Sequence, residues 1–292
     1  MNWLAISVLC AFCVATADAL TKRYLSDYTA LELTIVRLAW TAALLAPMLI
    51  YTWAGPLPPV FWAYMAVLAP LEILALALYM AAIRDSPLAQ TLPYLAFTPV
   101  LTLLTGYLFL GEQTSLPGGL GVVVVTLGIY LLNAEHLVQG DRRAWYGPFT
   151  AVAHMRGPRY MLGAAAIYSL TSVLGKAAME RVSPLFFGPL YYVILGLTAV
   201  IYGISRQAGV VRLLWRRPGR HLLIAVAMAG MVLTHFLAIK LAPTVAYVIA
   251  IKRCSILFGI VYGAWWFREH GVARNLAAGA LVVAGVVLIQ WK

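Results

Sequence analysis

The stretch TVAYVIAIKRCSILFGIVYGAWWF, Thr244 to Phe267, decides the fold of this chain. As an α-helix its two dozen residues would extend about 36 Å, enough to cross a hydrocarbon core of about 30 Å. Lys252 and Arg253 nevertheless lie inside it, roughly 12 Å from the Thr244 end. Each cation costs about 2.5–3.5 kcal/mol at the centre of a membrane helix, so both must face the protein interior, a water-filled cavity or an anion. They either bind an anionic substrate or are neutralised by internal carboxylates that hold helices together.

The composition of the whole chain indicates an all-α integral membrane protein. Of 292 residues, 63% are hydrophobic and 11% are charged, whereas a soluble protein carries about 25% charged residues. The mean hydropathy is +0.88. Long unbroken apolar runs exclude an outer-membrane barrel. The net charge of +11 does not indicate nucleic acid as a partner, because the cations cluster between the apolar spans.

Ten apolar segments are predicted to form transmembrane helices. They are residues 3–21, 30–52, 60–83, 87–110, 116–133, 160–178, 184–204, 220–240, 244–267 and 271–290. No cleavable signal peptide is predicted, because the N-terminus enters the first span without a basic leader. Cys10 and Cys13 form a CxxC on that span, and without a nearby histidine we interpret the pair as packing residues.

Two halves of the chain are similar to each other. YMAAIRDSP (79–87) ends the third span, and HFLAIKLAP (235–243) ends the eighth. At an offset of 157, three residues of the first half fall on identical residues of the second: Gly106 on Gly263, Glu112 on Glu269 and Gly128 on Gly285. The shared order predicts an internal duplication, with a first repeat at 1–135, a connecting loop at 136–159 and a second repeat at 160–292. Five spans in each repeat would insert the second upside down, an architecture typical of transporters.

With these features the chain resembles the drug/metabolite transporter superfamily in its EamA-type form of ten helices. The resemblance covers nearly the whole chain. It rests on the lysines that end the first and sixth spans, on Arg37, and on the paired strings AIRDSP and AIKLAP, LGE and FRE around the fourth and ninth spans. It implies a secondary transporter rather than an enzyme, with no cofactor. Two inverted five-helix repeats would alternate access to a cavity lined mainly by the third, fourth, eighth and ninth helices.

The segment VAYVIAIKRCSILF also resembles the ninth helix of plastid sugar-phosphate translocators and their nucleotide-sugar relatives, where a Lys-Arg pair holds phosphate. This resemblance implies that Lys252 and Arg253 hold an anionic group. A further phosphate lysine in the fourth helix of those translocators would fall near Leu95, where this sequence has no lysine. A singly charged group or a phosphodiester is therefore as compatible with the sequence as a doubly charged phosphate.

Three residues of the third and eighth spans are candidate substrate-site residues with structural alternatives. Glu72 is either a proton-coupling carboxyl or the counter-ion of Lys252 or Arg253. Tyr79 and His235 correspond under the repeat, and each either donates a hydrogen bond to substrate or joins neighbouring helices. An imidazole such as that of His235 can also titrate near neutral pH.

Other polar side chains within the spans are interpreted in the same way. Tyr94 and Tyr247 lie on the expected cavity helices and either shape a substrate pocket or pack. Arg37 matches the second-helix arginine of the family and is either a substrate ligand or a structural ion-pair partner. Asp18 and Glu32 lie near span ends, where an interfacial, solvated role is favoured.

Prolines and glycines predict where the spans bend and pack. Pro93 and Pro99 interrupt the fourth span, and each frees the carbonyl four residues earlier, that of Leu95 in the case of Pro99. Such carbonyls are tolerated at membrane depth only where they line a cavity or find another donor. The fourth span is therefore either a mobile gate or a static kink. The fifth and tenth spans, with Gly121 and Gly285, are either a close-packed scaffold or the face of a homodimer.

The positive residues lie mainly on one side of the predicted membrane. Connections after odd-numbered spans hold fourteen of them: Lys22, Arg23, Arg84, Arg142, Arg143, Arg156, Arg159, Arg206, Arg212, Arg216, Arg217, Arg220, Arg268 and Arg274. The other side holds four: Lys176, Arg181, Lys240 and Lys292. Since cytoplasmic loops are enriched in Lys and Arg, both termini are predicted to lie outside the cytoplasm.

The sequence thus predicts a secondary transporter that moves a small organic anion or a phosphate-bearing metabolite across a bacterial-type cytoplasmic (inner) membrane. Its expected partners are that substrate, or a lipid-linked phosphate, and the lipid bilayer. One alternative is an exporter of amino acids or other neutral or cationic metabolites. Two others are a flippase for a lipid-linked phosphate and a non-transporting subunit that scaffolds an enzyme.

Overall fold

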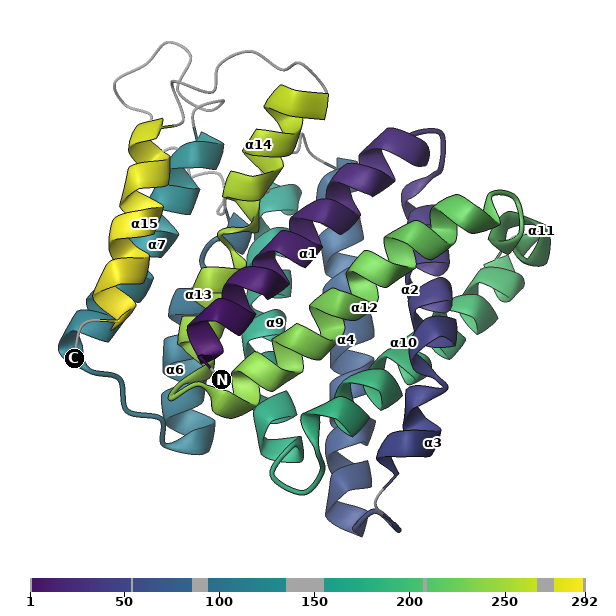
Figure 1. Cartoon of the computed structure of the whole chain (residues 1–292), viewed down its shortest axis with the longest axis horizontal. Coiled ribbons are helices and arrows are strands. Elements are labelled where there is room, and N and C mark those ends of the chain that lie inside the picture. Colours follow the sequence, from purple (N-terminus) through teal and green to yellow (C-terminus); the bar gives the residue numbers. More distant parts are fainter. Residues whose placement is uncertain are drawn as a thin grey trace. The chain divides into compact units, whose positions relative to one another are not determined.

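The computed structural model describes residues 2–53, 55–85, 94–134, 155–206, 209–266 and 276–290, and every regular element within them is a helix (Figure 1). The helices are α1 (Trp3–Tyr24), α2 (Ala30–Leu45), α3 (Met48–Thr52), α4 (Pro59–Asp85), α6 (Thr98–Leu110), α7 (Leu116–Ala134), α9 (Arg156–Ala178), α10 (Pro184–Arg206), α11 (Val210–Leu214), α12 (Pro218–Leu241), α13 (Val245–Lys252), α14 (Ser255–Trp266) and α15 (Leu276–Gln290).

Several of these helical stretches have the length and hydropathy of membrane spans. Six are long and apolar enough to cross a bilayer: Trp3–Tyr24, Pro59–Tyr79, Arg156–Ala178, Pro184–Arg206, Pro218–Leu241 and Val245–Gly263. Shorter apolar helices cover Thr98–Leu110, Leu116–Leu131 and Gly279–Gln290. The prediction of an all-helical, multi-span membrane protein is confirmed.

Three predicted spans are interrupted, the second and the ninth as follows and the fourth near Thr98. The second, predicted as one helix over 30–52, forms α2 and α3 with a turn at Ala46 and Pro47, because proline has no N–H to continue the helical ladder. The N-terminus of α2 is fixed by a capping box, in which Thr29 N donates to Glu32 Oε2 (2.7 Å) and Glu32 N to Thr29 Oγ1 (3.3 Å). The ninth is divided into α13 and α14 directly after the Lys-Arg pair.

The chain packs into two compact units, each assembled from both halves of the sequence. Unit 1 comprises Met1–Ala69, Lys176–Leu241 and Ser255–Arg268, and unit 2 comprises Pro70–Gly175, Ala242–Cys254 and Glu269–Lys292. The division into repeats at 1–135 and 160–292 concerns sequence similarity rather than packing, and it stays a prediction. The chain passes from one unit to the other within α4, at Pro70, and between α13 and α14, after Cys254.

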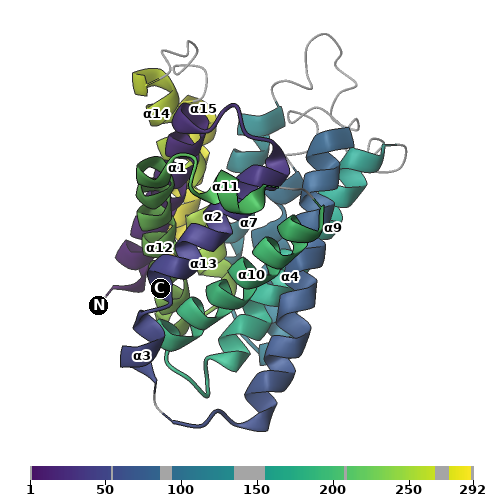
Figure 2. The ribbon, with the colours of Figure 1, turned by 90° about the vertical axis from the view of Figure 1, so that its right-hand side faces the viewer.

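Unit 1 is held together by two close helix pairs. α1 lies along α12 (Figure 1), where the Cys10 thiol donates to Met231 O (3.6 Å). α2 lies against α10 (Figure 2), and a Cβ on Gly196 would approach Leu38 O to 2.9 Å. Among the described residues, Cys10 and Cys13 form no disulfide, and Cys13 Sγ would lie 3.1 Å from a Cβ on Gly230 of α12. The cysteine pair therefore lies against α12.

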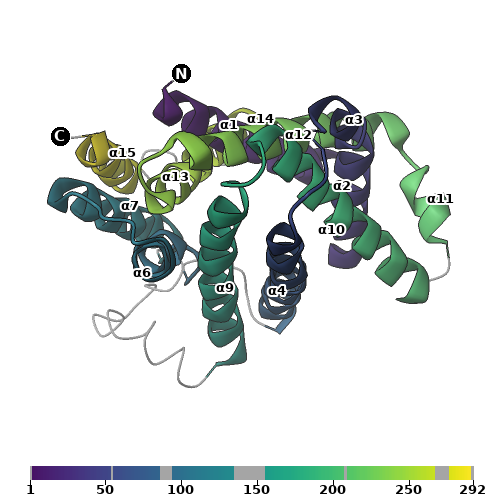
Figure 3. The ribbon, with the colours of Figure 1, turned by 90° about the horizontal axis from the view of Figure 1, so that it is seen from below.

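Unit 2 gathers α6, α7, α13 and α15 (Figure 3), with the closest approach between α7 and α15. A Cβ on Gly121 would lie 2.6 Å from Gly285 O, and one on Gly285 would lie 2.7 Å from Gly121 O. The two glycines predicted to mark close packing therefore lie against each other, backbone to backbone. Since the contact is within one chain, it favours the scaffold interpretation of these spans.

Candidate substrate site

The Lys-Arg pair lies at a break in the ninth span. α13 ends at Lys252, and its last turn is closed by bonds from Arg253 N to Ala250 O (3.1 Å) and from Cys254 N to Ile251 O (2.9 Å). These i→i−3 bonds tighten the final turn, after which α14 begins at Ser255. Neither proline nor glycine lies at the break, so the sequence gives no local signal for it.

A second break occurs in the fourth span. Residues Ala96 and Phe97 form a turn, and α6 begins at Thr98 with Pro99 in its first turn, where the missing proline N–H costs no hydrogen bond. Thr98 Oγ1 donates to Leu95 O at 2.6 Å. The carbonyl that Pro99 was predicted to leave free is thus bonded by a side-chain hydroxyl.

The two breaks are joined by a hydrogen bond between their side chains. Arg253 Nη2 donates to Thr98 Oγ1 at 3.0 Å, and Thr98 Oγ1 in turn donates to Leu95 O. Consecutive hydrogen bonds polarise one another, so each strengthens the next. The sequence singled out Arg253 but not Thr98, because a threonine in an apolar run carries no signal of a contact 155 residues away.

The neighbours of Arg253 that the structure describes are polar rather than acidic. Tyr79 and Tyr168 lie within electrostatic range of its guanidinium. The Nε atom is buried and finds no acceptor among the described residues. Within the described residues, one ion pair joins Arg37 to Asp18, and two others join Arg216 and Arg217 to Asp27. No carboxylate of the described residues therefore forms an ion pair with Arg253. The sequence did not indicate that Tyr168 or Thr98 lies near Arg253.

Glu112 positions the helix that carries the pair. Glu112 Oε2 accepts a hydrogen bond from Val245 N (2.9 Å), the first backbone N–H of α13. Gly111 adopts a left-handed conformation (φ 64°), and Glu112 N bonds to Gly106 O (3.1 Å), which ends α6 and turns the carboxylate toward α13. The string LGE therefore ends α6 and caps the N-terminus of α13, a role that the sequence did not predict.

The other predicted site residues fall into two groups. Within unit 2, Lys252 and Glu72 are half-buried on α13 and α4. Tyr94 is buried against Ala82 and Met161. The Tyr247 hydroxyl lies where a Cβ on Gly118 would overlap it. A substrate role for the two tyrosines stays a prediction.

His235 and Arg37 belong to unit 1. His235 is buried on α12 beside Phe236 (ring centroids 5.1 Å apart). Arg37 forms an ion pair with Asp18 at 2.8 Å, and its Nη2 also lies 3.2 Å from Met228 Sδ. Arg37 is therefore engaged as an ion-pair partner, and Asp18 is its counter-ion rather than that of the Lys-Arg pair.

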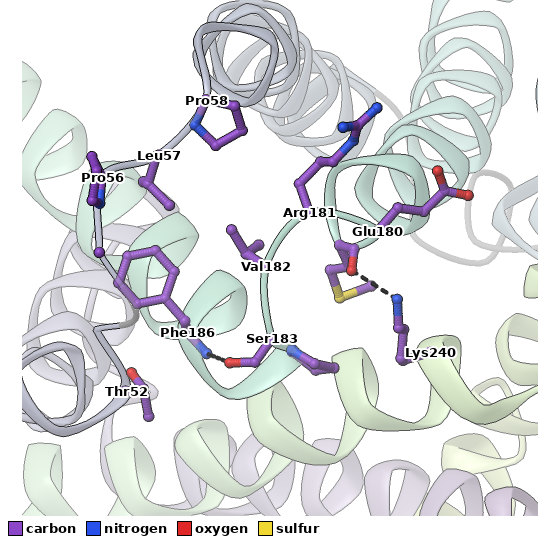
Figure 4. Close-up of a pocket in the computed structure, with 13 residues that line it drawn as sticks. Thr52, Pro56, Leu57, Pro58, Glu180, Arg181, Val182, Ser183, Phe186 and Lys240 are labelled. Carbon is purple, nitrogen blue, oxygen red and sulfur yellow. Dashed lines mark hydrogen bonds between the residues drawn. The ribbon is translucent and has the colours of Figure 1, made fainter.

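A separate cavity of about 290 Å³ lies in unit 1, between the connections that precede α4 and α10 (Figure 4). Leu57, Val182 and Phe186 form its apolar wall, and Lys240 at its edge donates to Met179 O (2.9 Å). None of the predicted substrate residues lines it. The cavity is thus distinct from the Arg253 site.

Comparison with known proteins defines the class of protein. Residues 1–134 match the model of the EamA-like transporter family. Twenty-eight chains of solved structures match. One, described as "Crystal structure of protein", aligns over 99% of this chain and 98% of its own length, with a TM-score of 0.75 and 15% identity, which shows the fold alone. No curated protein matches the sequence.

The described helices are those of an integral membrane protein. Residues 1–134 match the EamA-like transporter family, the family that the sequence resembles. Members of that family are membrane transporters of small molecules rather than enzymes.

Proposed function

We propose that this transporter carries a small organic anion or a phosphate-bearing metabolite by alternating access, and that Arg253 and Lys252 bind the anionic group. The observation that carries the proposal is Arg253, a membrane-embedded guanidinium with no carboxylate partner among the described residues. An unpaired cation at this depth costs several kcal/mol, and a bound anion would remove that cost.

The geometry around Arg253 suits an anion with several oxygens. A guanidinium presents its N–H groups in a planar fork that matches a carboxylate or a phosphate. One arm, Nη2, is fixed by Thr98, which orients the fork while leaving other donors for a ligand. The residue is only half-buried, so part of its surface stays accessible. Tyr79 and Tyr168 are close enough to contribute hydroxyl groups to the same ligand.

The binding test uses the full-length protein and ligand-induced thermal stabilisation. A ligand that binds only the native state raises the melting temperature by mass action. The panel holds phosphorylated metabolites, carboxylates, amino acids, cations and polyprenyl phosphates. Arg253→Ala should weaken binding of the stabilising anion about 10- to 150-fold, and Thr98→Val about fivefold, the losses typical of a charged and a neutral hydrogen bond.

Two variants of the same unit serve as matched controls. Arg159→Ala removes an exposed arginine, whose Nε donates to Met155 O, and Thr105→Val removes a hydroxyl that bonds to its own helix at Leu101 O. Both should bind as the wild type does. Unchanged stabilisation in Arg253→Ala and Thr98→Val would refute the site. A rise in melting temperature with amino acids or cations alone would favour the exporter alternative. A rise with polyprenyl phosphates alone would favour the flippase alternative.

Glu72 and His235 are proposed to couple transport to protons or to a counter-substrate. Glu72 is half-buried on α4, two residues beyond the proline at which the chain enters unit 2. If its carboxyl carries the proton, Glu72→Gln should keep ligand binding but lose the dependence of proteoliposome uptake on a pH gradient. Uptake by the variant that still follows the gradient would exclude Glu72 from coupling.

A further inference from the structure

A pair of arginines shares one aromatic ring at an end of unit 1. Tyr24, the last residue of α1, has the guanidinium of Arg23 5.7 Å and that of Arg220 5.4 Å from its ring centroid. The two guanidiniums are therefore at most about 11 Å apart, the sum of these distances. Arg23 also lies 5.0 Å from the ring centroid of Trp266, at the end of α14. Cation–π contacts hold both arginines at the ends of three membrane helices.

These two arginines differ from their neighbours in having no acidic partner. Arg216 and Arg217 both contact Asp27, at 3.5 and 2.7 Å. Within the described residues, neither Arg23 nor Arg220 forms an ion pair, and both side chains are exposed. Four guanidiniums at this end of the unit thus accompany two carboxylates, that of Asp27 and that of Glu32, which lies within electrostatic range of Tyr28. The local excess of positive charge is suited to an anion from outside the protein.

An apolar surface continues from the arginine pair along the helices. On α12, Leu223 follows Arg220 by three residues and lies on the same helix face, and Val226 lies three residues further along and around the helix. These two side chains are 47% and 54% exposed. On α14, Val261 and Trp265 are 61% and 73% exposed. These helices have the length and hydropathy of membrane spans, so their exposed apolar side chains are expected to contact lipid chains.

We propose that Arg23 and Arg220 bind the phosphate of an anionic phospholipid, with Tyr24 and Trp266 as the aromatic platform and an acyl chain on the exposed face of α12. The charge pattern favours an anionic headgroup, because the ammonium of a zwitterionic lipid would be repelled by the remaining guanidiniums. The adjoining apolar face favours a lipid over free phosphate. This site uses none of the residues of the proposed substrate site.

The test compares phosphatidylglycerol, phosphatidylcholine and inorganic phosphate as stabilisers of the full-length protein in detergent. Phosphatidylglycerol should raise the melting temperature, and the lipid concentration for half of that effect should rise about thirtyfold in Arg23→Gln/Arg220→Gln, since each basic residue contributes about fivefold at a membrane surface. Arg206→Gln is the matched control. Arg206 also stacks on a single tyrosine, Tyr202 (5.3 Å), but lacks a second arginine, and its loss should leave the response unchanged.

A second measurement keeps the proposal testable should the double variant fold poorly. In the wild-type protein the phosphatidylglycerol effect should shrink when salt rises from about 0.05 to about 0.5 M, because an exposed charged site is screened. Equal stabilisation by phosphatidylcholine, an unaltered response in the double variant, or insensitivity to salt would overturn the proposal. Stabilisation by inorganic phosphate alone to the same extent would reassign the site to a free anion.

Discussion

The hydroxyl of Thr98 connects two features that the sequence treats separately, the proline-interrupted fourth span and the cationic ninth span. It donates to the carbonyl that Pro99 cannot satisfy and accepts from Arg253. A backbone carbonyl without a donor and a cation within an apolar span are each costly when buried. The Thr98 hydroxyl supplies a hydrogen bond to both of them. The bond to Thr98 therefore fixes the orientation of the Arg253 guanidinium, which the proposed site needs as well as its charge.

A pH-dependent stability is predicted for the connection between α1 and α2. The hydrogen bond from Arg217 lowers the pKa of the Asp27 carboxyl below its ordinary value of 3.8. A depressed folded-state pKa gives stability that is fully present above the unfolded value and is lost as pH falls through the folded value. The melting-temperature advantage of wild type over Asp27→Asn should therefore be constant at neutral pH and shrink below about pH 4.

The measurement is a series of melting curves from neutral to acidic pH on both proteins. Arg217→Gln removes the main partner and should reduce the same pH dependence, while Arg216 remains near Asp27. A constant difference between wild type and Asp27→Asn across the whole range would show that the Asp27 charge contributes nothing to stability. Asp27 is exposed, so the effect should also diminish in high salt.

The short helix α13, one part of the interrupted ninth span, carries the Lys-Arg pair at its C-terminal end. α13 has eight residues. An isolated helix of that length is marginal, so its position depends on its contacts. Its first N–H is capped by Glu112, and its last residue precedes the arginine that reaches Thr98. Helices α6 and α7 pack against α13 and enclose it. The short helix is thus fixed at both ends by residues of the first half of the sequence.

A packing prediction follows for the α7–α15 pair. Gly121→Ala would place a methyl 2.6 Å from Gly285 O and 2.7 Å from Ile289 N, backbone atoms that cannot move aside without separating the helices. Overpacking of this kind costs about 1–3 kcal/mol. Gly121→Ala should therefore lower the melting temperature by several degrees.

Gly119→Ala, two residues earlier on the same helix, is the control for that prediction. Its added methyl would meet only Thr114 Oγ1, at an ordinary 3.7 Å, so stability should be equal or slightly higher. Melting curves in the same detergent decide the matter. Equal melting temperatures for the two variants would contradict the close contact between α7 and α15.

The distribution of charge over the whole chain predicts how it lies in the membrane. Fourteen basic residues fall in connections after odd-numbered spans and four on the other side. We propose that the first group lies in the cytoplasm and that both termini lie outside it, in the inner membrane. Ser26 and Glu180 are exposed residues of the two groups of connections.

Cysteine labelling tests this orientation. In a background without the three native cysteines, Glu180→Cys should react with a membrane-impermeant maleimide in intact cells. Ser26→Cys should react only after permeabilisation. The reverse pattern would place the termini in the cytoplasm. The proteins must retain wild-type melting behaviour for the comparison to be valid.

Sequence alone determined the class of this protein, because hydropathy, charge and span length follow from composition and order. The same evidence identified Arg253 as a costly cation, and the repeated strings indicated the transporter family. Tertiary structure decided how these residues are used. It placed Thr98 and Tyr168 near Arg253, paired Arg37 with Asp18, and made Glu112 a cap for α13. Such contacts join residues far apart in the chain, and no local periodicity or composition encodes them.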